Sequence, residues 1–458
     1  MKKILSIARV VLLLLLRNGT ALGMIFITST LAVFIFFATN SNCSIADELH
    51  LRLKYSLIAM TTLVNVSVLY LSVFSLRKDI DERRFHTIAA APVYRLQIWF
   101  GKFLGIFITG AITFTIATLA IWCSIYIFIS NWEQKRDIKS LDKHFYASYM
   151  QCEPDLTELN SEISIEYKKR LKKLIQAQNQ EEISEDDEKE GMRWRKRKYM
   201  LYEVRREKQM IPPGEKFQWD FTWNSKNAYN DDAFISFKSY SNQREKKFKG
   251  IWSIVDMDGK ILWSKEFSDY PYLDYKVNLP INVLPKSGNF KLEFKNIGKS
   301  YVVFPIFNHG LKILYHDSNI FQNYILYMIF SFLGIAITTA LALTCASIFS
   351  FPVAVFVAMI FYFVENMSGL LKNILNDLSY HDSSFIIIFY KSIITFVLWL
   401  TQMIQIPPVN SMFANSISIP AKRLILTWGV TYLIYFLIIV IIGTFILKNK
   451  ELDKILSK

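Results

Sequence analysis

Long apolar segments lie at both ends of this chain, and a polar stretch lies between them. The apolar runs cover residues 20–38, 55–76, 106–130, 320–364, 385–404 and 424–447. About 20 consecutive apolar residues suffice for a helix to cross the hydrocarbon core of a bilayer. Hydrophobic residues make up 52% of the chain, which is typical of a membrane protein. The pattern predicts a helical polytopic membrane protein with a soluble insertion at 131–317.

Basic residues predict which side of the membrane each connection faces. Residues 1–18 contain a leucine-rich run that is too short to cross a membrane and is flanked by basic residues. This pattern favours an amphipathic helix on the cytoplasmic surface. The connection 76–97 and the tail after residue 447 are both rich in Lys and Arg, so both are predicted to be cytoplasmic. Residues 39–54 are then a short outer loop. Since seven crossings would put the basic tail outside, we expect six spans, with 385–404 as a re-entrant or interfacial segment on the outer side.

The connection at 76–97 has the features of a short charged helix that ends at a proline. Asp79, Asp81 and Glu82 open it, and carboxylates suit the N-terminal turns of a helix. Pro92 cannot continue a helix and restricts the residue before it. The same charges are also typical of an ordinary solvated loop between two spans, and charge alone does not separate the two interpretations.

The order of parts resembles the first cytoplasmic loop of type 2 ABC exporter permeases. The charged helix is followed by Pro92-Val93-Tyr94-Arg95 and then by Gly101-Lys102-Phe103-Leu104-Gly105. In that family the helix docks on a separate ATPase subunit, and a Gly-Lys-x-x-Gly sequence starts the third span. The resemblance implies that the ATPase-coupling residues are Asp79, Asp81, Glu82, Arg83, Arg84, His86, Thr87, Pro92 and Arg95, and that Gly101 and Lys102 start the span. We expect the ammonium group of Lys102, one turn inside the apolar run, to reach back to the membrane interface.

The C-terminal part is similar to the same family. It has a Ser-Phe-Pro-Val-Ala turn at 350–354, a segment running into Pro407-Pro408, and a last helix that ends in Lys-Asn-Lys-Glu-Leu. The resemblance covers the two membrane parts, 1–130 and 318–458. It implies nothing about the large domain at 131–317.

The insertion divides into a helical part and a strand-rich part. In 131–210, an apolar stripe from Ile163 to Ile175 has helical spacing, and an acidic run at 181–190 precedes a basic run at 193–208. The two runs are typical of solvated helix faces or a disordered linker, and pairing between them is the alternative.

From 211 to 317 the apolar period changes to two, which is typical of half-buried strands. Phe217, Trp219 and Phe221 alternate with polar residues, and Asp258-Gly259 is a strong hairpin signal. Seven or eight short strands predict an antiparallel β-sandwich, so the fold class is α-helical and polytopic with an extracytoplasmic α+β insertion. The aromatic rows either form its core or stack on a ligand such as a sugar; both interpretations stay open.

The sequence lacks the common catalytic and metal-binding motifs. No P-loop is present, because Gly101-Lys102-Phe103 has neither the preceding glycine spacing nor a following hydroxyl residue. No catalytic triad motif, His-x-x-x-His or Cys-x-x-Cys occurs, so we expect no catalytic residue, metal or cofactor. Cys43 and Cys152 would share the outer side, which leaves a disulfide between them open.

These features lead to a functional hypothesis and one rival. The resemblance implies a non-catalytic permease subunit of an exporter in the bacterial cytoplasmic membrane, driven by a separate ATP-binding subunit and paired with a second permease copy or a related permease. Membrane lipid is then a partner. Nucleic acid is not expected, because much of the +14 net charge flanks the apolar runs. The rival is a membrane-anchored sensor whose β-sandwich binds an extracytoplasmic ligand.

Overall fold

The chain folds into two compact units, which are described separately. The computed structural model describes residues 2–40, 45–82, 94–130, 147–178, 199–222, 233–241, 246–280, 283–285, 288–305, 310–367, 371, 374–375, 385–402, 409–420 and 429–456. The first unit, the helical unit, comprises Met1–Ala147, Asn319–Leu375 and Tyr390–Lys458. The second, the β unit, comprises Ser148–Ser318 and Asn376–Phe389.

The N-terminal part of the helical unit contains one short helix and three long ones. They are α1 (Lys2–Arg17), α2 (Thr20–Ala38), α3 (Ile45–Asp81) and α5 (Arg95–Ser130). Helix α2 has the bounds that the hydropathy predicts, whereas α3 and α5 are longer than the apolar runs within them. The predicted outer loop at 39–54 is wrong in its second half, because α3 already begins at Ile45.

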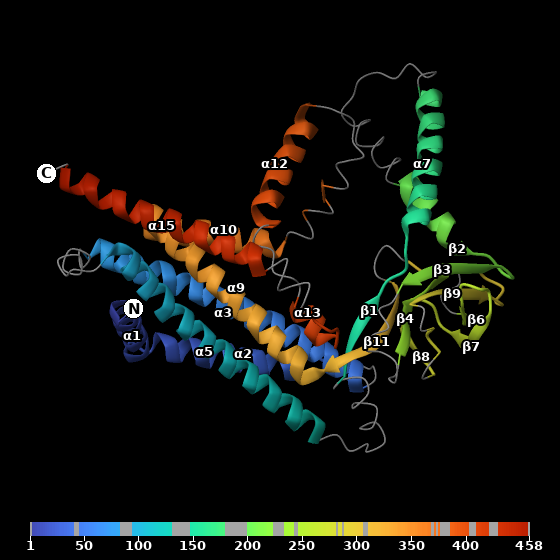
Figure 1. Cartoon of the computed structure of the whole chain (residues 1–458), viewed down its shortest axis with the longest axis horizontal. Coiled ribbons are helices and arrows are strands. Elements are labelled where there is room, and N and C mark those ends of the chain that lie inside the picture. Colours follow the sequence, from blue (N-terminus) through green and yellow to red (C-terminus); the bar gives the residue numbers. More distant parts are fainter. Residues whose placement is uncertain are drawn as a thin grey trace. The chain divides into compact units, whose positions relative to one another are not determined.

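The C-terminal part contributes α9 (Ile320–Ile348), α10 (Phe351–Asn366), α12 (Phe385–Gln402), α13 (Val409–Ala414) and α15 (Val430–Leu456). The turn between α9 and α10 lies at residues 349–350, close to its predicted place. Helices α2, α3, α5 and α9 run along one another, and α15 lies beside α9 (Figure 1).

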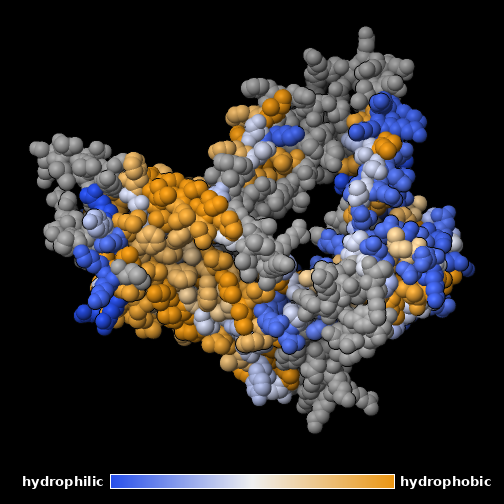
Figure 2. Space-filling view, in the orientation of Figure 1, coloured by the Kyte–Doolittle hydropathy of each residue, from blue (hydrophilic) through white to orange (hydrophobic). Residues whose placement is uncertain are grey.

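Four of the described helices are long and apolar enough to cross a membrane. They are α2, α5, α9 and residues 48–81 of α3, whereas the apolar parts of α10, α12 and α15 are shorter. Hydrophobic side chains cover most of the visible face of the helical unit, and hydrophilic ones gather at the end where α1 lies and α3 terminates (Figure 2). This distribution is that of a membrane protein, because apolar side chains facing outward are stable in lipid.

Small residues allow the long helices to approach closely. A Cβ atom on Gly110 of α5 would lie 2.7 Å from Val68 Cγ2 of α3 and 3.0 Å from Ile335 Cγ2 of α9. Hydroxyl side chains in the same helices return their hydrogen bonds to the preceding turn, as when Thr113 Oγ1 donates to the carbonyl oxygen of Thr109 at 2.9 Å. Both are typical of helices that pack in lipid, where close backbone contact replaces the hydrophobic effect.

The β unit is built from eleven strands among its described residues, of which nine begin within 211–317, where seven or eight are predicted. They are β1 (Ala147–Cys152), β2 (Met210–Ile211), β3 (Lys216–Thr222), β4 (Ala233–Lys238), β5 (Tyr240–Ser241), β6 (Phe248–Val255), β7 (Ile261–Asp269), β8 (Asp274–Leu279), β9 (Asn289–Asn296), β10 (Val302–Val303) and β11 (Leu311–Asn319). Two sheets have four strands, in the orders β1-β11-β4-β8 and β3-β9-β6-β7, and a small one has the order β2-β10-β5.

The sheets share one aromatic core. Trp252 of β6 is fully buried, with its ring 4.9 Å from that of Phe237 on β4 and 4.7 Å from that of Phe294 on β9. Trp219 and Phe221 are buried in the same cluster. The alternating aromatic residues of these strands therefore form the core, and the ligand-stacking interpretation does not hold for them.

Strands β6 and β7 form the hairpin predicted at Asp258-Gly259. They pair antiparallel, and Gly259 adopts φ of 82° in the turn between them. A positive φ favours glycine because other residues meet steric strain there, so the prediction from Asp-Gly is confirmed.

The predicted helical stripe forms α7 (Thr157–Gln178), which packs on a second helix at residues 199–209. Ile163 is buried against Leu201 and Val204 of that helix. Two ion pairs join the helices, Arg170 to Glu207 at 2.6 Å and Lys208 to Glu162 at 3.0 Å. The acidic run and most of the basic run lie outside the described residues.

Candidate functional site

The candidate site lies where α3 ends and α5 begins, at the hydrophilic end of the helical unit. Of the predicted coupling residues, the structure describes Asp79, Asp81, Glu82 and Arg95, together with the span-start residues Gly101 and Lys102. Arg83, Arg84, His86, Thr87 and Pro92 fall in 83–93, outside the described residues.

No new helix begins after Ser75; instead, α3 continues to Asp81. Asp79 and Asp81 therefore lie in its last turns, so their placement in the N-terminal turns of a separate helix is wrong. No proline or glycine interrupts the chain from 76 to 82. Arg77 pairs with Asp81 at 3.1 Å and Lys78 with Glu82 at 4.0 Å, each one turn apart. Such i,i+4 pairs support the helix and offset the unfavourable carboxylates at its C-terminal end.

Lys102 forms a buried ion pair with Asp79. Its Nζ lies 2.5 Å from Asp79 Oδ2, and it also donates to the carbonyl oxygen of Ser75 at 2.5 Å. The side chain of Lys102 is 4% exposed and that of Asp79 21% exposed. The end of α3 offers the ammonium group of Lys102 its acceptors inside the protein. That this group lies at the membrane interface stays a prediction. The pair ties α3 to α5 on either side of segment 83–93.

Helix α1 packs on the neighbouring glycines of α5. A Cβ atom on Gly101 would lie 2.6 Å from Ile7 Cβ, and one on Gly105 would lie 2.8 Å from Val11 Cβ. Only a residue without a side chain allows α1 to lie this close, so Gly101 and Gly105 act as a small-xxx-small contact. The amphipathic N-terminal helix predicted from the sequence is thus packed on α5, beside the ion pair.

Aromatic residues of the same turns of α5 contact α15. Trp99 is fully buried and stacks on Phe103 at 5.6 Å, and Phe103 lies 5.0 Å from Phe436. A Cβ atom on Gly443 would lie 3.1 Å from Trp99 Nε1 and 2.7 Å from Thr344 Oγ1 of α9. Within two turns α5 therefore contacts α1, α3 and α15.

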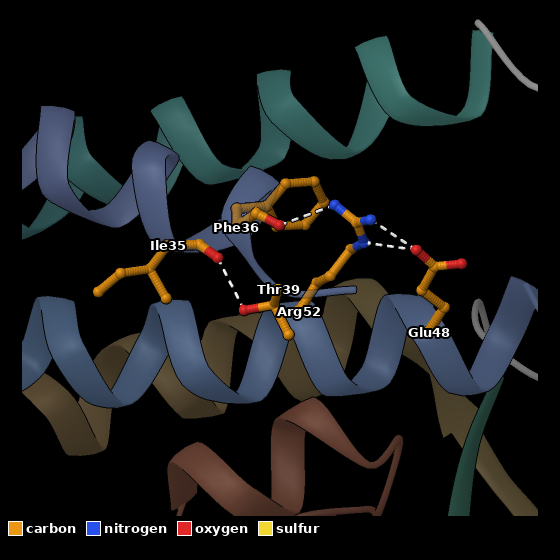
Figure 3. Close-up of polar contacts among 5 residues, drawn as sticks. All are labelled: Ile35, Phe36, Thr39, Glu48 and Arg52. Carbon is orange, nitrogen blue, oxygen red and sulfur yellow. Dashed lines mark hydrogen bonds and ion pairs between the residues drawn. The ribbon is translucent and has the colours of Figure 1, made fainter. Parts of the chain in front are cut away.

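A second buried ion pair lies near the N-terminal end of α3 (Figure 3). Arg52 is held to Glu48 by its Nε at 3.0 Å and its Nη2 at 2.5 Å, and its Nη1 donates to the carbonyl oxygen of Phe36 at 2.9 Å. The guanidinium group also lies 4.5 Å from the ring centre of Phe128 on α5. The pair joins the ends of α2, α3 and α5. The i,i+4 spacing of Glu48 and Arg52 is a sequence signal for it once the region is known to be helical.

Side chains of the long helices hold the backbone of α13 and the residues after it. Asn323 Nδ2 donates to the carbonyl oxygen of Ile417 at 2.8 Å, and its Oδ1 accepts from the N–H group of Ile419 at 2.9 Å. His50 Nδ1 lies 2.6 Å from the carbonyl oxygen of Ala414. An irregular segment among apolar helices needs such partners, because its backbone groups have no helical ones.

A disulfide between Cys43 and Cys152 stays a prediction that the structure does not test, because only Cys152 is described. Cys152 is a free thiol in β1, and its Sγ donates to the carbonyl oxygen of Thr222 at 3.0 Å. Burial raises the pKa of this thiol to about 11, so it stays protonated at neutral pH. Cys43 lies outside the described residues.

In the described part of the chain, no group of three or more His, Cys, Asp or Glu side chains could hold a metal ion. The candidate site contains one buried ion pair, between Asp79 and Lys102, and close helix contacts at Gly101 and Gly105. No protein-family model matches this chain, and no curated protein matches it.

Proposed function

We propose that this protein is the transmembrane permease subunit of an ATP-binding cassette transporter. It acts as an exporter and is driven by a separate ATP-binding subunit that docks on segment 83–93 and its flanks. The proposal rests on the Pro-Val-x-Arg and Gly-Lys-x-x-Gly sequences around Pro92 and Gly101, and on the site into which the second of these folds.

The ion pair between Asp79 and Lys102 is the observation that carries the proposal. It joins the last turns of α3 to the first turns of α5, on the two sides of the segment that would dock. A force on that segment therefore moves both helices together. Helix α1 moves with them, because it packs on the glycines of α5. Rigid helices that move as packed bodies are a common means of switching between two conformational states.

The proposed topology has six spans. They are α2, α3, α5, α9, α10 and α15, with both termini in the cytoplasm of a bacterium and residues 131–317 outside. The segment 385–404 enters the membrane from the outer side. The backbone from Ala414 to Ile419 supports this arrangement, because His50 and Asn323 satisfy its polar groups inside the helical unit. Six spans are half a transporter, so a second copy or a related permease completes it, with lipid around both.

A charge exchange at the flank of the segment tests the docking role. Glu82→Lys with Arg83→Glu should leave insertion and the fold of the β unit unchanged, because exposed pairs within a helix contribute only about 0.3–0.5 kcal/mol. Like charges facing a complementary partner surface cost several kcal/mol of association. We therefore expect the ATPase subunit to be lost on co-purification, and transport with it.

The matched control is the same exchange in an exposed pair of the β unit, Glu162→Lys with Lys208→Glu. The control should recover the ATPase subunit as the unmodified protein does. Normal recovery of the subunit and normal transport in the Glu82 and Arg83 variant would contradict the docking role. Reporter fusions at Ala91 and after Lys458 should be cytoplasmic, and fusions at Ser130 and Ser318 should be outside. A cytoplasmic signal from any fusion within 131–317 would overturn the topology.

A further inference from the structure

The outer face of the sheet β3-β9-β6-β7 contains a hollow of about 700 Å³. It lies on the side of the sheet away from the aromatic core, and the turn at Gly214 and Glu215 forms one wall. This volume is in the range of ligand pockets, which is about 300–1,000 Å³. The hollow belongs entirely to the β unit.

Small side chains at the centre of the sheet produce the hollow. The strand register places Glu293 of β9, Ser253 of β6 and Ser264 of β7 in one row across the sheet. The next row contains Lys295 and Ile251. Two serines surrounded by long side chains leave a depression, because side chains on one face of a sheet stand side by side at fixed spacing.

The floor of the hollow carries hydrogen-bonding groups with little net charge. Glu293 Oε2 accepts from Lys216 Nζ at 3.1 Å and from Gln218 Nε2 at 2.6 Å, so its charge is already paired. Lys216 and Lys295 balance Glu215 and Glu293 among the residues that line the hollow. A strongly anionic or cationic ligand therefore gains little from this face.

Aliphatic surface lies next to these polar groups. Ile251 and Ile261 line the hollow, and Ile261 is exposed. A ligand that fits must present many hydroxyl groups to a carboxylate, an ammonium and two serine hydroxyls, and C–H surface to two isoleucines. A peptide added as an extra strand does not fit, because the floor of the sheet presents side chains and not a free backbone edge.

We propose that this hollow binds a neutral oligosaccharide. Glu293 accepts hydrogen bonds from sugar hydroxyl groups and Lys295 donates to them, with Ser253 on the floor and the isoleucines against the C–H faces of the sugar rings. The aromatic residues are not available for stacking, since Trp219 and Trp252 are buried in the core. The open shape favours a segment of a longer glycan over a single enclosed ring. The proposal does not depend on the permease function, because binding requires neither ATP nor a partner subunit.

The test measures binding to the purified full-length protein in detergent. The probes are fluorescently labelled maltohexaose, cellohexaose, chitohexaose and mannohexaose, with an anionic heparin hexasaccharide for comparison. At least one neutral probe should bind. Ser253→Leu, which fills the floor, and Glu293→Gln, which removes the charged acceptor, should each weaken that binding by about tenfold or more, a change of about 1.4 kcal/mol.

Two further variants separate a lost site from a damaged fold. Ser264 is exposed on β7, so Ser264→Phe should block the hollow without unfolding the sheet. Lys249 lies on the same face of β6 but does not line the hollow, so Lys249→Ala should change affinity by no more than about twofold. Binding by none of the neutral probes, unchanged binding by Ser264→Phe, or binding of the heparin probe alone would each overturn the proposal.

Discussion

Breaking the ion pair between Asp79 and Lys102 should destabilise the helical unit strongly, and the loss should depend on which partner is replaced. Asp79→Asn leaves an ammonium group that is almost fully buried and takes away its charged partner, so that neutral acceptors such as the carbonyl oxygen of Ser75 remain. Lys102→Met leaves a carboxylate that is a fifth exposed, at the end of a helix where it can turn toward water. Asp79→Asn should therefore cost more free energy of unfolding than Lys102→Met.

The magnitudes follow from the burial of each partner. Removing one member of a buried pair costs about 3–5 kcal/mol, because the other charge is left uncompensated. For Lys102→Met we expect about 1–3 kcal/mol, since water can reach the remaining carboxylate. The double variant leaves no buried charge, so it should cost at least about 1 kcal/mol less than the sum of the single variants.

Reversible unfolding in mixed detergent micelles, followed by tryptophan fluorescence, measures these free energies. The matched control is the exposed pair Lys78 and Glu82 at 4.0 Å, whose cycle of Lys78→Met and Glu82→Gln should give a coupling below about 0.5 kcal/mol. Additive effects of the Asp79 and Lys102 substitutions, or single effects as small as those of the control pair, would refute the assignment of a buried pair that holds α3 to α5.

Two other substitutions and one labelling experiment test close contacts, strain and burial. Gly101→Ala should loosen α1 from α5, because the added Cβ would lie 2.6 Å from Ile7 Cβ of α1. Gly23→Ala is the control and should be neutral, because its Cβ would meet nothing within 4 Å. Cross-linking of α1 to α5 through engineered cysteines measures the difference. Gly259→Ala should destabilise the β6-β7 hairpin by about 1–2 kcal/mol, read by thermal unfolding, because φ is 82° there; an unchanged midpoint would contradict the left-handed turn. Cys152 should resist maleimide at pH 7 and react readily only after unfolding, because burial raises its pKa to about 11; rapid labelling of the folded protein would argue against the buried thiol.

Periodic patterns in the sequence were sufficient for much of the fold. The apolar run at 20–38 predicts α2 to the residue, because its flanks change from polar to apolar abruptly. Alternating aromatic residues predict β3 and β9, because successive side chains of a strand point to opposite faces. Asp258-Gly259 predicts the hairpin, because its turn needs a residue that tolerates a positive φ.

The candidate site could be located from the sequence, but its contacts could not be predicted. Pro92 and the Gly101-Lys102 pair mark the connection, yet the sequence does not indicate that α3 continues to Asp81 or that Lys102 turns inward. Charged residues near a span boundary can face water or a buried partner, and the choice depends on which helix packs beside them. The hollow at Ser253 could not be predicted from the sequence either, because the order of the strands decides which side chains surround it.

The sequence by itself determined the two classes of structure in this protein, since hydropathy and side-chain period are properties of neighbouring residues. It determined neither the seat of α1 on Gly101 and Gly105 nor the partners of Asp79 and Arg52. Only the tertiary structure decided these, because residues far apart in the chain meet when helices pack. A buried charge takes whatever partner that packing provides, since leaving it unpaired costs several kcal/mol.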